Sequence, residues 1–542
     1  MSDSSTSGPV EAAPRRQLAR SGVAVAAGTA LSRVTGFLRV AALAALGFAR
    51  LTDVYNIANS TPNIVYELLL GGILTASLVP MFVEYHQRDD DRARDAITTV
   101  SMVALLALSA AGVVFAPLIA RLYTSQLSGD VAAQQHLMTD LLRMLMPQIF
   151  FYGVTALFAA MLNARRRFAA AAFAPALNNI VVIAVLLALP RLRPGRETVT
   201  SVLAHPTEEW LLGLGTTLGV VVMTVVLWPA LRGAGVRLRW AWDLRHPAVR
   251  RLARLSGWTV GYAVANQIAF WVVLVLSYRS SGDTSSYLAA FTFFQLPHGL
   301  FTVSVMTVVG PELARAAIAR DEAAFRRRFA SGLRVIGLVV IPAGALMVVL
   351  ARPIITGALD YGNFSAASVT TTATTLAWFA TGLFAFSAYL YTVRGMYAHL
   401  DTRTPFLVNV LENVLNIGLA IVLYPHLGVR GLAISWSVAY TVAAIVAWVI
   451  LDRRLGGLEG TRSLSILARI AAATAVGAAA AWAIARVIDP ATSPAAILTV
   501  VVAGAVGFAI AVGGAAALRV PEIAELRTTL TRTPRAGGMT ST

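Results

Sequence analysis

The sequence predicts an all-α, polytopic membrane protein with about fourteen transmembrane helices. Hydrophobic residues make up 57% of its 542 residues and charged residues only 13%, whereas about a quarter of the residues in a soluble domain are charged. Apolar stretches of about 18 residues or more recur along the whole chain. Arginines are dense in alternate loops between these stretches, as expected for a chain that crosses a bilayer repeatedly.

Each predicted helix is an apolar segment long enough for the hydrocarbon core, which takes about 20 residues. The segments lie at about 22–48, 56–85, 96–120, 139–163, 168–190, 210–231, 253–278, 287–314, 332–351, 370–397, 404–425, 430–451, 465–487 and 494–518. Pro62 lies within the second segment and Pro297 within the eighth. Because membrane helices tolerate proline where neighbouring groups satisfy the freed backbone, we expect bent helices there.

The arginines predict the orientation of the chain. All 44 basic residues are arginines, and with a cytoplasmic N-terminus 31 of them fall on the cytoplasmic side and nine on the opposite side. The positive-inside rule therefore places both termini in the cytoplasm. The Ala/Arg-rich, lysine-free composition is typical of a GC-rich bacterial genome, so we expect the chain in a bacterial plasma membrane. This distribution explains the net charge of +17 without a nucleic acid partner. The remaining four arginines lie within membrane segments: Arg33, Arg39, Arg143 and Arg394.

An internal repeat predicts the domain organisation. Pro62 and Pro297 are separated by 235 residues, and so are Asn178 and Asn413. We expect two six-helix lobes around a central cavity, followed by two additional helices, an architecture typical of transporters with alternating access. The predicted parts are a cytoplasmic tail, the two lobes, the helix pair and a second cytoplasmic tail, at 1–20, 21–232, 233–451, 452–518 and 519–542.

Missing residue types exclude several enzyme classes. The chain has no cysteine for disulfides or thiolate chemistry, and no lysine for a P-loop or a Schiff base. Its seven histidines lack metal-ligand spacing. We therefore predict no enzymatic activity and no bound cofactor. Asp89–Asp91 resembles the carboxylate cluster of a glycosyltransferase, but a solvated cytoplasmic loop is the simpler interpretation, so a polyprenyl-phosphate enzyme stays an alternative.

Two arginines in the first segment are the main candidates for substrate binding. Arg33 and Arg39 are separated by six residues, which places them about 120° apart on an ideal helix. A buried arginine in a bilayer usually faces a polar cavity or a partner, and guanidinium groups match phosphate oxygens bidentately. Gly36 lies between them and permits a bend that would let both reach one pyrophosphate. Alternatively, Arg39 extends to the interface and Arg33 pairs with a structural carboxylate.

Other polar side chains complete the predicted sites. Ser32, Asp53 and Asn63 are further substrate-binding candidates, and Asp53 could instead be favoured by the dipole at a helix N-terminus. Gly36, Pro62 and Pro297 are candidate hinges. The helically spaced Asn409, Glu412 and Asn413 are weak candidates for a cation site, although hydrogen bonding between helices is the commoner use of such residues.

Several motifs resemble those of the MurJ (MviN) family of lipid II flippases, over residues 20 to 520. The motifs are Ser32-Arg-Val-Thr-Gly-Phe-Leu-Arg39, Asp53, Pro62-Asn63, Leu68-Leu-Leu-Gly-Gly, Ala76-Ser-Leu-Val-Pro-Met-Phe, Gln295-Leu-Pro-His-Gly, Val303-Ser-Val-Met-Thr, Tyr361-Gly-Asn-Phe and Tyr397-Ala-His-Leu-Asp-Thr-Arg-Thr-Pro405. The resemblance implies the fold of the multidrug/oligosaccharidyl-lipid/polysaccharide exporter superfamily. It also implies that Arg33, Arg39 and Asp53 match functionally important positions.

This chain departs from the family pattern at three positions. Many members have an arginine where this chain has Tyr66 beside Glu67, and another where it has Thr292. An acidic residue that often follows the second arginine is replaced by Val40. We therefore expect a cavity less basic than in many members. Some members also bind sodium, which makes a coupling monovalent cation a further expectation.

The predicted function is a flippase that moves lipid II, a peptidoglycan precursor linked to undecaprenyl pyrophosphate, from the inner to the outer leaflet by alternating access. The predicted partners are this lipid-linked anionic substrate, membrane lipids and proteins of cell-wall synthesis. The membrane potential is the expected driving force, since a pyrophosphate moves outward from a negative interior downhill. Alternatives are a polysaccharide-lipid flippase, a cation-coupled exporter of the same superfamily, and a paralogue that binds lipid without moving it.

Overall fold

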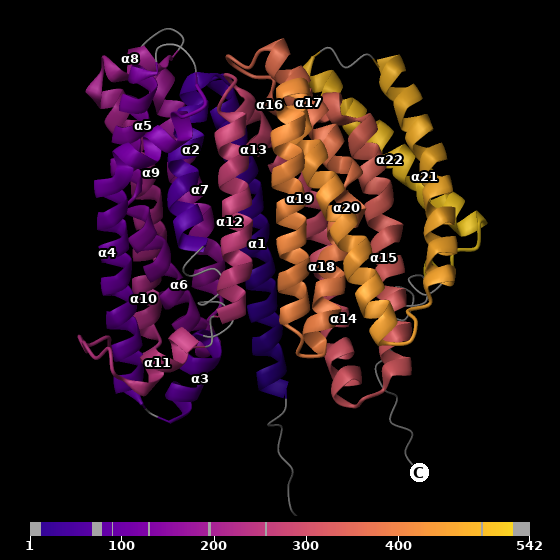
Figure 1. The fold of residues 1–542 in the computed structure, drawn as a ribbon, viewed down its shortest axis with the longest axis horizontal. Helices are drawn as coiled ribbons and strands as arrows, with labels where there is room; N and C mark the ends of the chain where they lie inside the picture. The colour runs from indigo at the N-terminus through magenta and orange to yellow at the C-terminus, as the bar shows by residue number, and fades with distance from the viewer. Residues whose placement is uncertain are drawn as a thin grey trace, which may run out of the picture. The chain divides into compact units, whose positions relative to one another are not determined.

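The computed structural model describes residues 12–67, 78–88, 90–127, 131–192, 197–254, 257–488 and 492–523, and their side chains except at 12–22 and 252–260. Every regular element in these residues is helical (Figure 1). The helices are α1 (Ala12–Ala45), α2 (Arg50–Tyr66), α3 (Val79–Gln87), α4 (Asp91–Thr124), α5 (Ala132–Leu145), α6 (Gln148–Ala164), α7 (Ala169–Leu192), α8 (Val199–Leu203), α9 (Pro206–Val225), α10 (Leu227–Gly233), α11 (Pro247–Arg254), α12 (Gly257–Ser277), α13 (Asp283–Pro297), a π-helical turn (His298–Thr302), α14 (Val303–Ile318), α15 (Glu322–Val349), α16 (Ala351–Leu359), α17 (Ala366–Thr381), α18 (Leu383–Ala398), α19 (Arg403–Leu427), α20 (Val429–Arg454), α21 (Gly460–Ile488) and α22 (Ser493–Ala517).

Membrane-spanning helices dominate the fold, as the sequence predicts. In the described part, 11 helices are long and apolar enough to cross a membrane, and the pair α17–α18, bent by 46°, would make twelve. The two other predicted segments, 56–85 and 253–278, each contain residues outside the described part. The all-helical class is therefore confirmed, whereas the count of fourteen is not and stays a prediction.

The chain forms two compact units, each described here by itself. Unit 1 comprises residues up to Leu46 together with Arg50–Gln267, and unit 2 comprises Gly47–Ala49 together with Ile268–Thr542. In unit 1, α1 packs along α7, α7 along α9, and α2 against α5 and α6. In unit 2, α19 and α18 pack on α20, and α15 packs on α21. The predicted division at residue 233 stays a prediction.

The short turn between α1 and α2 is built into unit 2. Gly47 has a φ of +87°, which favours glycine, and a Cβ there would lie 2.8 Å from the carbonyl oxygen of Asn363. The rings of Phe48 and Phe364 pack edge to face, with centroids 4.9 Å apart. The motif Tyr361-Gly-Asn-Phe364 therefore has a structural role, because its Asn363 and Phe364 pack against the turn at Gly47 and Phe48.

The two additional helices, α21 and α22, pack closely through small residues. A Cβ on Gly477 would collide with the backbone carbonyl of Gly507, so glycine is required for this approach. Buried ion pairs of Arg334 attach the start of α21 and the segment after α22 to α15. Arg334 of α15 donates to Glu522, just after α22, and to Glu459, just before α21. The predicted C-terminal tail therefore begins with residues that pack against unit 2.

A helix distortion follows Pro297, whereas a bend at Pro62 and the hinge role of both prolines stay predictions. Pro62 lies inside α2 near its end. Pro297 ends α13 and is followed by the π-helical turn His298–Thr302 before α14 continues the span. In contrast, α1 stays α-helical through Gly36. The motif residues at 68–77, which include Gly71-Gly72, lie outside the described residues.

Candidate functional site

Polar side chains from four helices meet in unit 1 around Tyr152 of α6. Its side chain interacts with those of Asn63 of α2 and Asn178 of α7, and electrostatically with Arg39 of α1. Its ring lies 5.7 Å, centroid to centroid, from that of Tyr66 at the end of α2. The structure therefore brings together the predicted residues Arg39 and Asn63. The sequence analysis missed Tyr152, because nothing in the apolar pattern of α6 distinguishes this tyrosine from a packing residue.

A second set of contacts joins α1 to α7 next to this cluster. The side-chain nitrogen of Asn179 donates to the carbonyl oxygen of Ser32 and to the hydroxyl of Thr35, both at 3.2 Å. Ser32 thus contributes its backbone to this contact. A Cβ at Gly36 would lie 3.5 Å from the same Asn179 nitrogen, which is an ordinary van der Waals distance. Asn179 therefore forms hydrogen bonds between α1 and α7.

The two intramembrane arginines of α1 have different surroundings. Arg33 is exposed on the surface of unit 1, whereas Arg39 is half-buried beside Tyr152. Neither arginine forms an ion pair with any acidic side chain among the described residues. Their guanidinium groups therefore keep their hydrogen-bonding capacity for an anionic ligand. Asp53 is fully buried in the first turn of α2, where the helix dipole favours a carboxylate, and its effect on the arginines stays a prediction.

A ladder of buried polar side chains lies on α19 in unit 2. The Asn413 side chain donates to the Asn409 carbonyl at 2.8 Å, and Asn416 accepts from Ser435 of α20 at 3.1 Å. Glu412 is 1% exposed, and one of its carboxylate oxygens has no hydrogen-bond partner among the described residues. No group of three or more potential metal ligands was found in the part of the chain that the structure describes. The cation role of Asn409, Glu412 and Asn413 stays a prediction.

Two positions where many family members carry arginine are occupied differently here. Tyr66 packs on Tyr152 and so joins the cluster of unit 1. Thr292 donates its hydroxyl to the Leu288 carbonyl within its own helix, at 2.9 Å. A residue that sequence reasoning treated only as part of a motif, His298, lies 3.0 Å from the Ser387 hydroxyl and packs on Phe386. Its place in the π-helical turn brings this polar contact into the core of unit 2.

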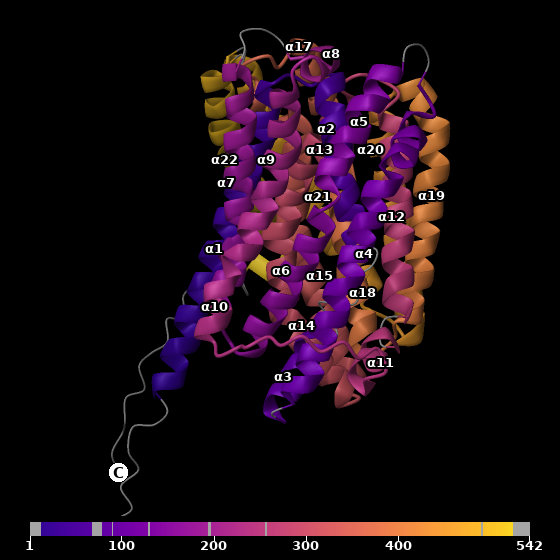
Figure 2. The same cartoon turned by 90° about the vertical axis from the view of Figure 1, so that its left-hand side faces the viewer.

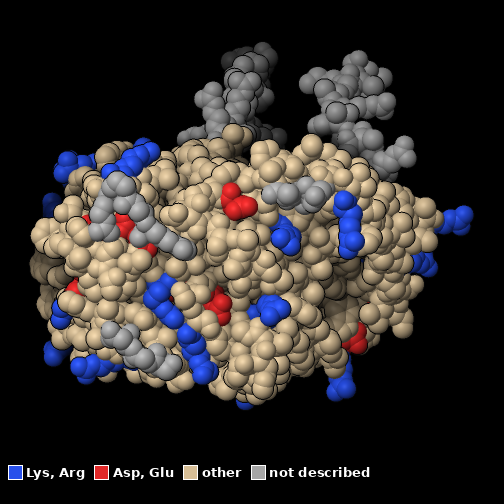
Figure 3. Space-filling view, turned by 90° about the horizontal axis from the view of Figure 1, so that it is seen from above, with Lys and Arg blue, Asp and Glu red and all other residues tan. Residues whose placement is uncertain are grey.

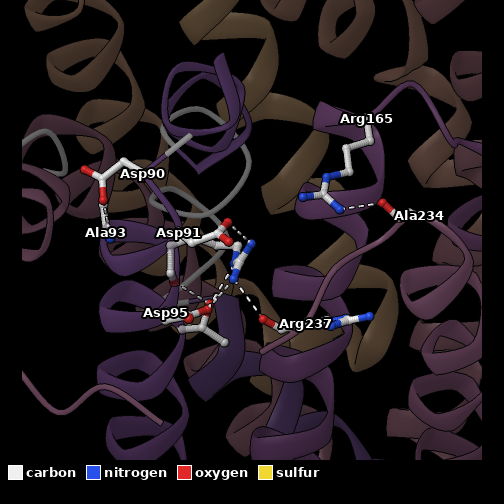
Figure 4. Close-up of polar contacts among 9 residues, drawn as sticks. Asp90, Asp91, Ala93, Asp95, Arg165, Ala234 and Arg237 are labelled. Carbon is white, nitrogen blue, oxygen red and sulfur yellow. Dashed lines mark hydrogen bonds and ion pairs between the residues drawn. The ribbon is translucent and has the colours of Figure 1, made fainter. Parts of the chain in front are cut away.

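The acidic run near the start of α4 has a structural use. Asp90 accepts from the Ala93 amide at 2.9 Å and caps α4, while Asp91 and Asp95 both pair with Arg94 (Figure 4). Asp89 lies outside the described residues. Asp90 and Asp91 thus have structural roles at the start of α4, and the solvated-loop interpretation stays a prediction.

The motif Asp401-Thr-Arg-Thr-Pro405 forms the start of α19. The Asp401 carboxylate accepts from the Thr404 amide at 3.0 Å and pairs with Arg454, which also donates to the Thr404 hydroxyl. Burial alone would raise the pKa of Asp401, but the hydrogen bonds from Thr404 and Arg454 outweigh it and lower the pKa.

At the opposite end of the helices, charged side chains among the described residues are scattered and form no large patch of one sign (Figure 3).

Long apolar helices, a proline-linked π-helical break and polar side chains within the membrane segments define a multi-pass membrane protein of the transporter class. The family model described as lipid II flippase MurJ matches residues 43–503, and the chain belongs to this family. The matched stretch begins after Arg33 and Arg39, so their roles rest on the motif of α1 itself.

Relatives and solved structures agree with this family. The chain is 29% identical over 478 residues to a probable lipid II flippase MurJ of Vibrio cholerae, covering 85% of this chain and 88% of the relative. It is 28% identical to the lipid II flippase MurJ of Burkholderia cenocepacia, over 79% and 82% of the two chains. Among solved structures, an inward closed lipid II flippase MurJ gives a TM-score of 0.72 at 20% identity, covering 90% of this chain and 98% of the other. An inward-facing multidrug transporter of the MATE family gives a TM-score of 0.63 at 15% identity, covering 79% and 96%.

Proposed function

We propose that this chain is a transporter, not an enzyme, and that it moves lipid II from the inner to the outer leaflet of the plasma membrane by alternating access. The observation that carries this proposal is the family match over residues 43–503. The two compact units, each with its own helix packing, are consistent with two bodies that move relative to each other during transport. Proteins of cell-wall synthesis are the expected partners.

Arg39 and Arg33 are the proposed ligands of the pyrophosphate. A guanidinium group offers a planar set of donors that pairs bidentately with phosphate oxygens, and neither arginine is already neutralised by a described carboxylate. Tyr152, which interacts electrostatically with Arg39, would help to orient it and so lower the entropy lost on binding. Asp53, whose carboxylate is fully buried at the start of α2, would orient or release the two arginines.

The membrane potential is the proposed driving force. It contributes about 2.3 kcal/mol per elementary charge per 100 mV, and a pyrophosphate that leaves a negative interior moves downhill. The chain also lacks the lysine on which a P-loop for ATP depends. A coupling monovalent cation is a further proposal, with Asn409, Glu412 and Asn413 as its ligands, because Glu412 is buried with an oxygen that lacks a described donor.

A cation-coupled exporter is the second candidate function. The buried Glu412 favours it, since a carboxylate with one oxygen that lacks a described hydrogen-bond partner would attract a cationic substrate or a coupling ion. The exposed Arg33 and half-buried Arg39 favour an anionic substrate instead. The flippase and the exporter therefore differ in the charge of the transported substrate.

Depletion of the protein in its host, with leaflet-resolved labelling of lipid II, tests the proposal. Lipid II should accumulate in the inner leaflet, and wild type should restore transfer whereas Arg39→Ala should not. Arg143→Ala is the matched control, because Arg143 is 52% exposed and forms only a surface ion pair with Asp140. Unchanged lipid II distribution on depletion would reject the flippase. Rescue by Arg39→Ala would keep the flippase but remove Arg39 from its binding site.

A further inference from the structure

The connector between α10 and α11, residues 234–246, forms no helix and crosses one end of unit 1 (Figure 2). Three hydrogen bonds attach its backbone to α4 and to the end of α6. Arg165 donates to the Ala234 carbonyl, and Arg94 donates to the Arg237 carbonyl at 2.9 Å (Figure 4). The Ala241 amide donates to the Thr99 hydroxyl at 3.1 Å. The path of this connector is therefore determined by unit 1.

Side-chain contacts hold the connector near both of its ends. Arg94 is 8% exposed and is itself held by Asp91 and Asp95, so it is fixed before it reaches the connector. After the connector, Arg251 of α11 pairs with Glu84 of α3 at 2.8 Å. These contacts hold the backbone of the connector on unit 1, and its remaining side chains extend from that backbone.

Those remaining side chains include large apolar groups that face away from unit 1. Trp240 is 75% exposed, Trp242 51% and Leu244 55%. Trp240 and Trp242 occupy alternate positions of the non-helical stretch, and Leu244 follows in the turn that precedes α11. Large exposed apolar side chains gathered in a few residues mark an interaction surface, because leaving them in water is unfavourable.

Their depth along α4 matches the membrane interface. A helix of 34 residues is about 51 Å long, whereas the hydrocarbon core is about 30 Å thick, so α4 extends beyond the core. Thr99 is the ninth residue of α4, about 12 Å from its start and just past the charged Asp91–Asp95. Trp240 and Trp242 flank the residue bonded to Thr99, and tryptophan is enriched at this depth.

The charge of the same surface identifies its partner. Arg237, Arg239, Arg245 and Arg250 are exposed, whereas the only acidic residue between 234 and 250, Asp243, accepts from the Arg245 amide at 3.0 Å. Basic residues at the interface attract anionic lipids, and guanidinium groups pair with phosphate oxygens. A membrane surface with anionic headgroups satisfies both the aromatic and the basic side chains.

We propose that residues 236–250 form an interfacial anchor that binds anionic phospholipid headgroups and holds unit 1 at a fixed depth in the membrane. The positive-inside orientation assigns this anchor to the cytoplasmic leaflet. The two tryptophans and Leu244 insert among the headgroups, and the arginines bind the phosphates. Because the backbone of the anchor is hydrogen-bonded to α4 and α6, lipid binding acts on unit 1 directly.

A single spin label tests the anchor, because the chain contains no cysteine. Leu244→Cys in the full-length protein is labelled in nanodiscs of phosphatidylcholine alone or mixed with phosphatidylglycerol. Collisions of the label with oxygen, which partitions into lipid, are compared with collisions with a water-soluble nickel chelate. Gln87→Cys, an exposed polar position at the end of α3 in the same unit, is the control.

The anchor predicts a several-fold loss of nickel accessibility at residue 244 relative to residue 87, and a further loss when phosphatidylglycerol is added. Substitution of Arg239, Arg245 and Arg250 by glutamine should abolish the effect of phosphatidylglycerol and leave the oxygen accessibility high. A label at 244 that is as accessible to nickel as the label at 87 would overturn the anchor. A response to phosphatidylglycerol that survives the three substitutions would overturn its recognition of anionic headgroups.

Discussion

Replacement of Arg334 by alanine should detach the ends of the two additional helices from α15. Arg334 is 5% exposed and donates to Glu522, which is 1% exposed, and to Glu459 at 3.1 Å. Without the guanidinium group, the Glu522 carboxylate would stay buried with no positive partner. Its second oxygen already has no hydrogen-bond partner among the described residues, so the carboxylate depends strongly on Arg334.

The expected loss of stability follows from burial. Removing one partner of a buried ion pair costs about 3–5 kcal/mol, because an uncompensated charge is left in the interior. Arg462 provides the comparison: it is 61% exposed and pairs with Glu459 at 3.5 Å. An exposed pair of this kind contributes about 1 kcal/mol or less, so Arg462→Ala should have a small effect.

Thermal unfolding of the detergent-solubilised protein measures this difference. Arg334→Ala should lower the unfolding temperature by several degrees more than Arg462→Ala. Adding Glu522→Gln to Arg334→Ala should restore part of the loss, because the buried charge is then removed as well. Equal effects of Arg334→Ala and Arg462→Ala, or strictly additive effects in the double variant, would refute the reasoning.

Three further predictions concern single contacts. Asn179→Ala should destabilise the protein by about 1 kcal/mol in the same unfolding assay, since it removes the hydrogen bonds from Asn179 of α7 to Ser32 and Thr35 of α1. A loss of stability no larger than that of an exposed substitution such as Gln87→Ala would contradict this prediction. Gly47→Ala should destabilise the folded protein by about 1–3 kcal/mol, because alanine is strained at a φ of +87° and its Cβ would meet the Asn363 carbonyl oxygen. An unchanged unfolding temperature would show that the turn at Gly47 does not stabilise the fold. The pKa of Asp401 is lowered in the folded state, so the stabilisation from this carboxylate is present at neutral pH and is lost below about pH 4. Asp401→Asn should therefore weaken the loss of stability on acidification. An unchanged dependence of the unfolding temperature on pH would argue against the pairing of Asp401 with Thr404 and Arg454.

The candidate site was partly predictable from the sequence. An arginine inside an apolar segment is conspicuous because burying its charge in lipid is costly, so Arg33 and Arg39 could be identified without coordinates. Tyr152 could not, because a tyrosine in an apolar helix has the same local pattern whether it packs or bonds. Tyr66 was noted only as a departure from the family, and the structure shows its packing against Tyr152.

The sequence by itself determined that the chain is a multi-pass helical membrane protein. This information is local, because each segment must satisfy its own backbone hydrogen bonds in lipid and must be long and apolar to do so. The position of Pro297 likewise predicted a distorted helix, although only the structure defined the π-helical turn that follows.

Only the tertiary structure decided which distant residues meet. Arg334 and Glu522 are 188 residues apart, Asn179 and Ser32 are 147 apart, and Arg94 reaches a carbonyl 143 residues away. No periodicity records such pairs, since they depend on how whole helices pack rather than on the composition of either one. The interfacial anchor was hidden for the same reason, because an aromatic and basic loop acquires its direction only when its backbone is attached to α4 and α6.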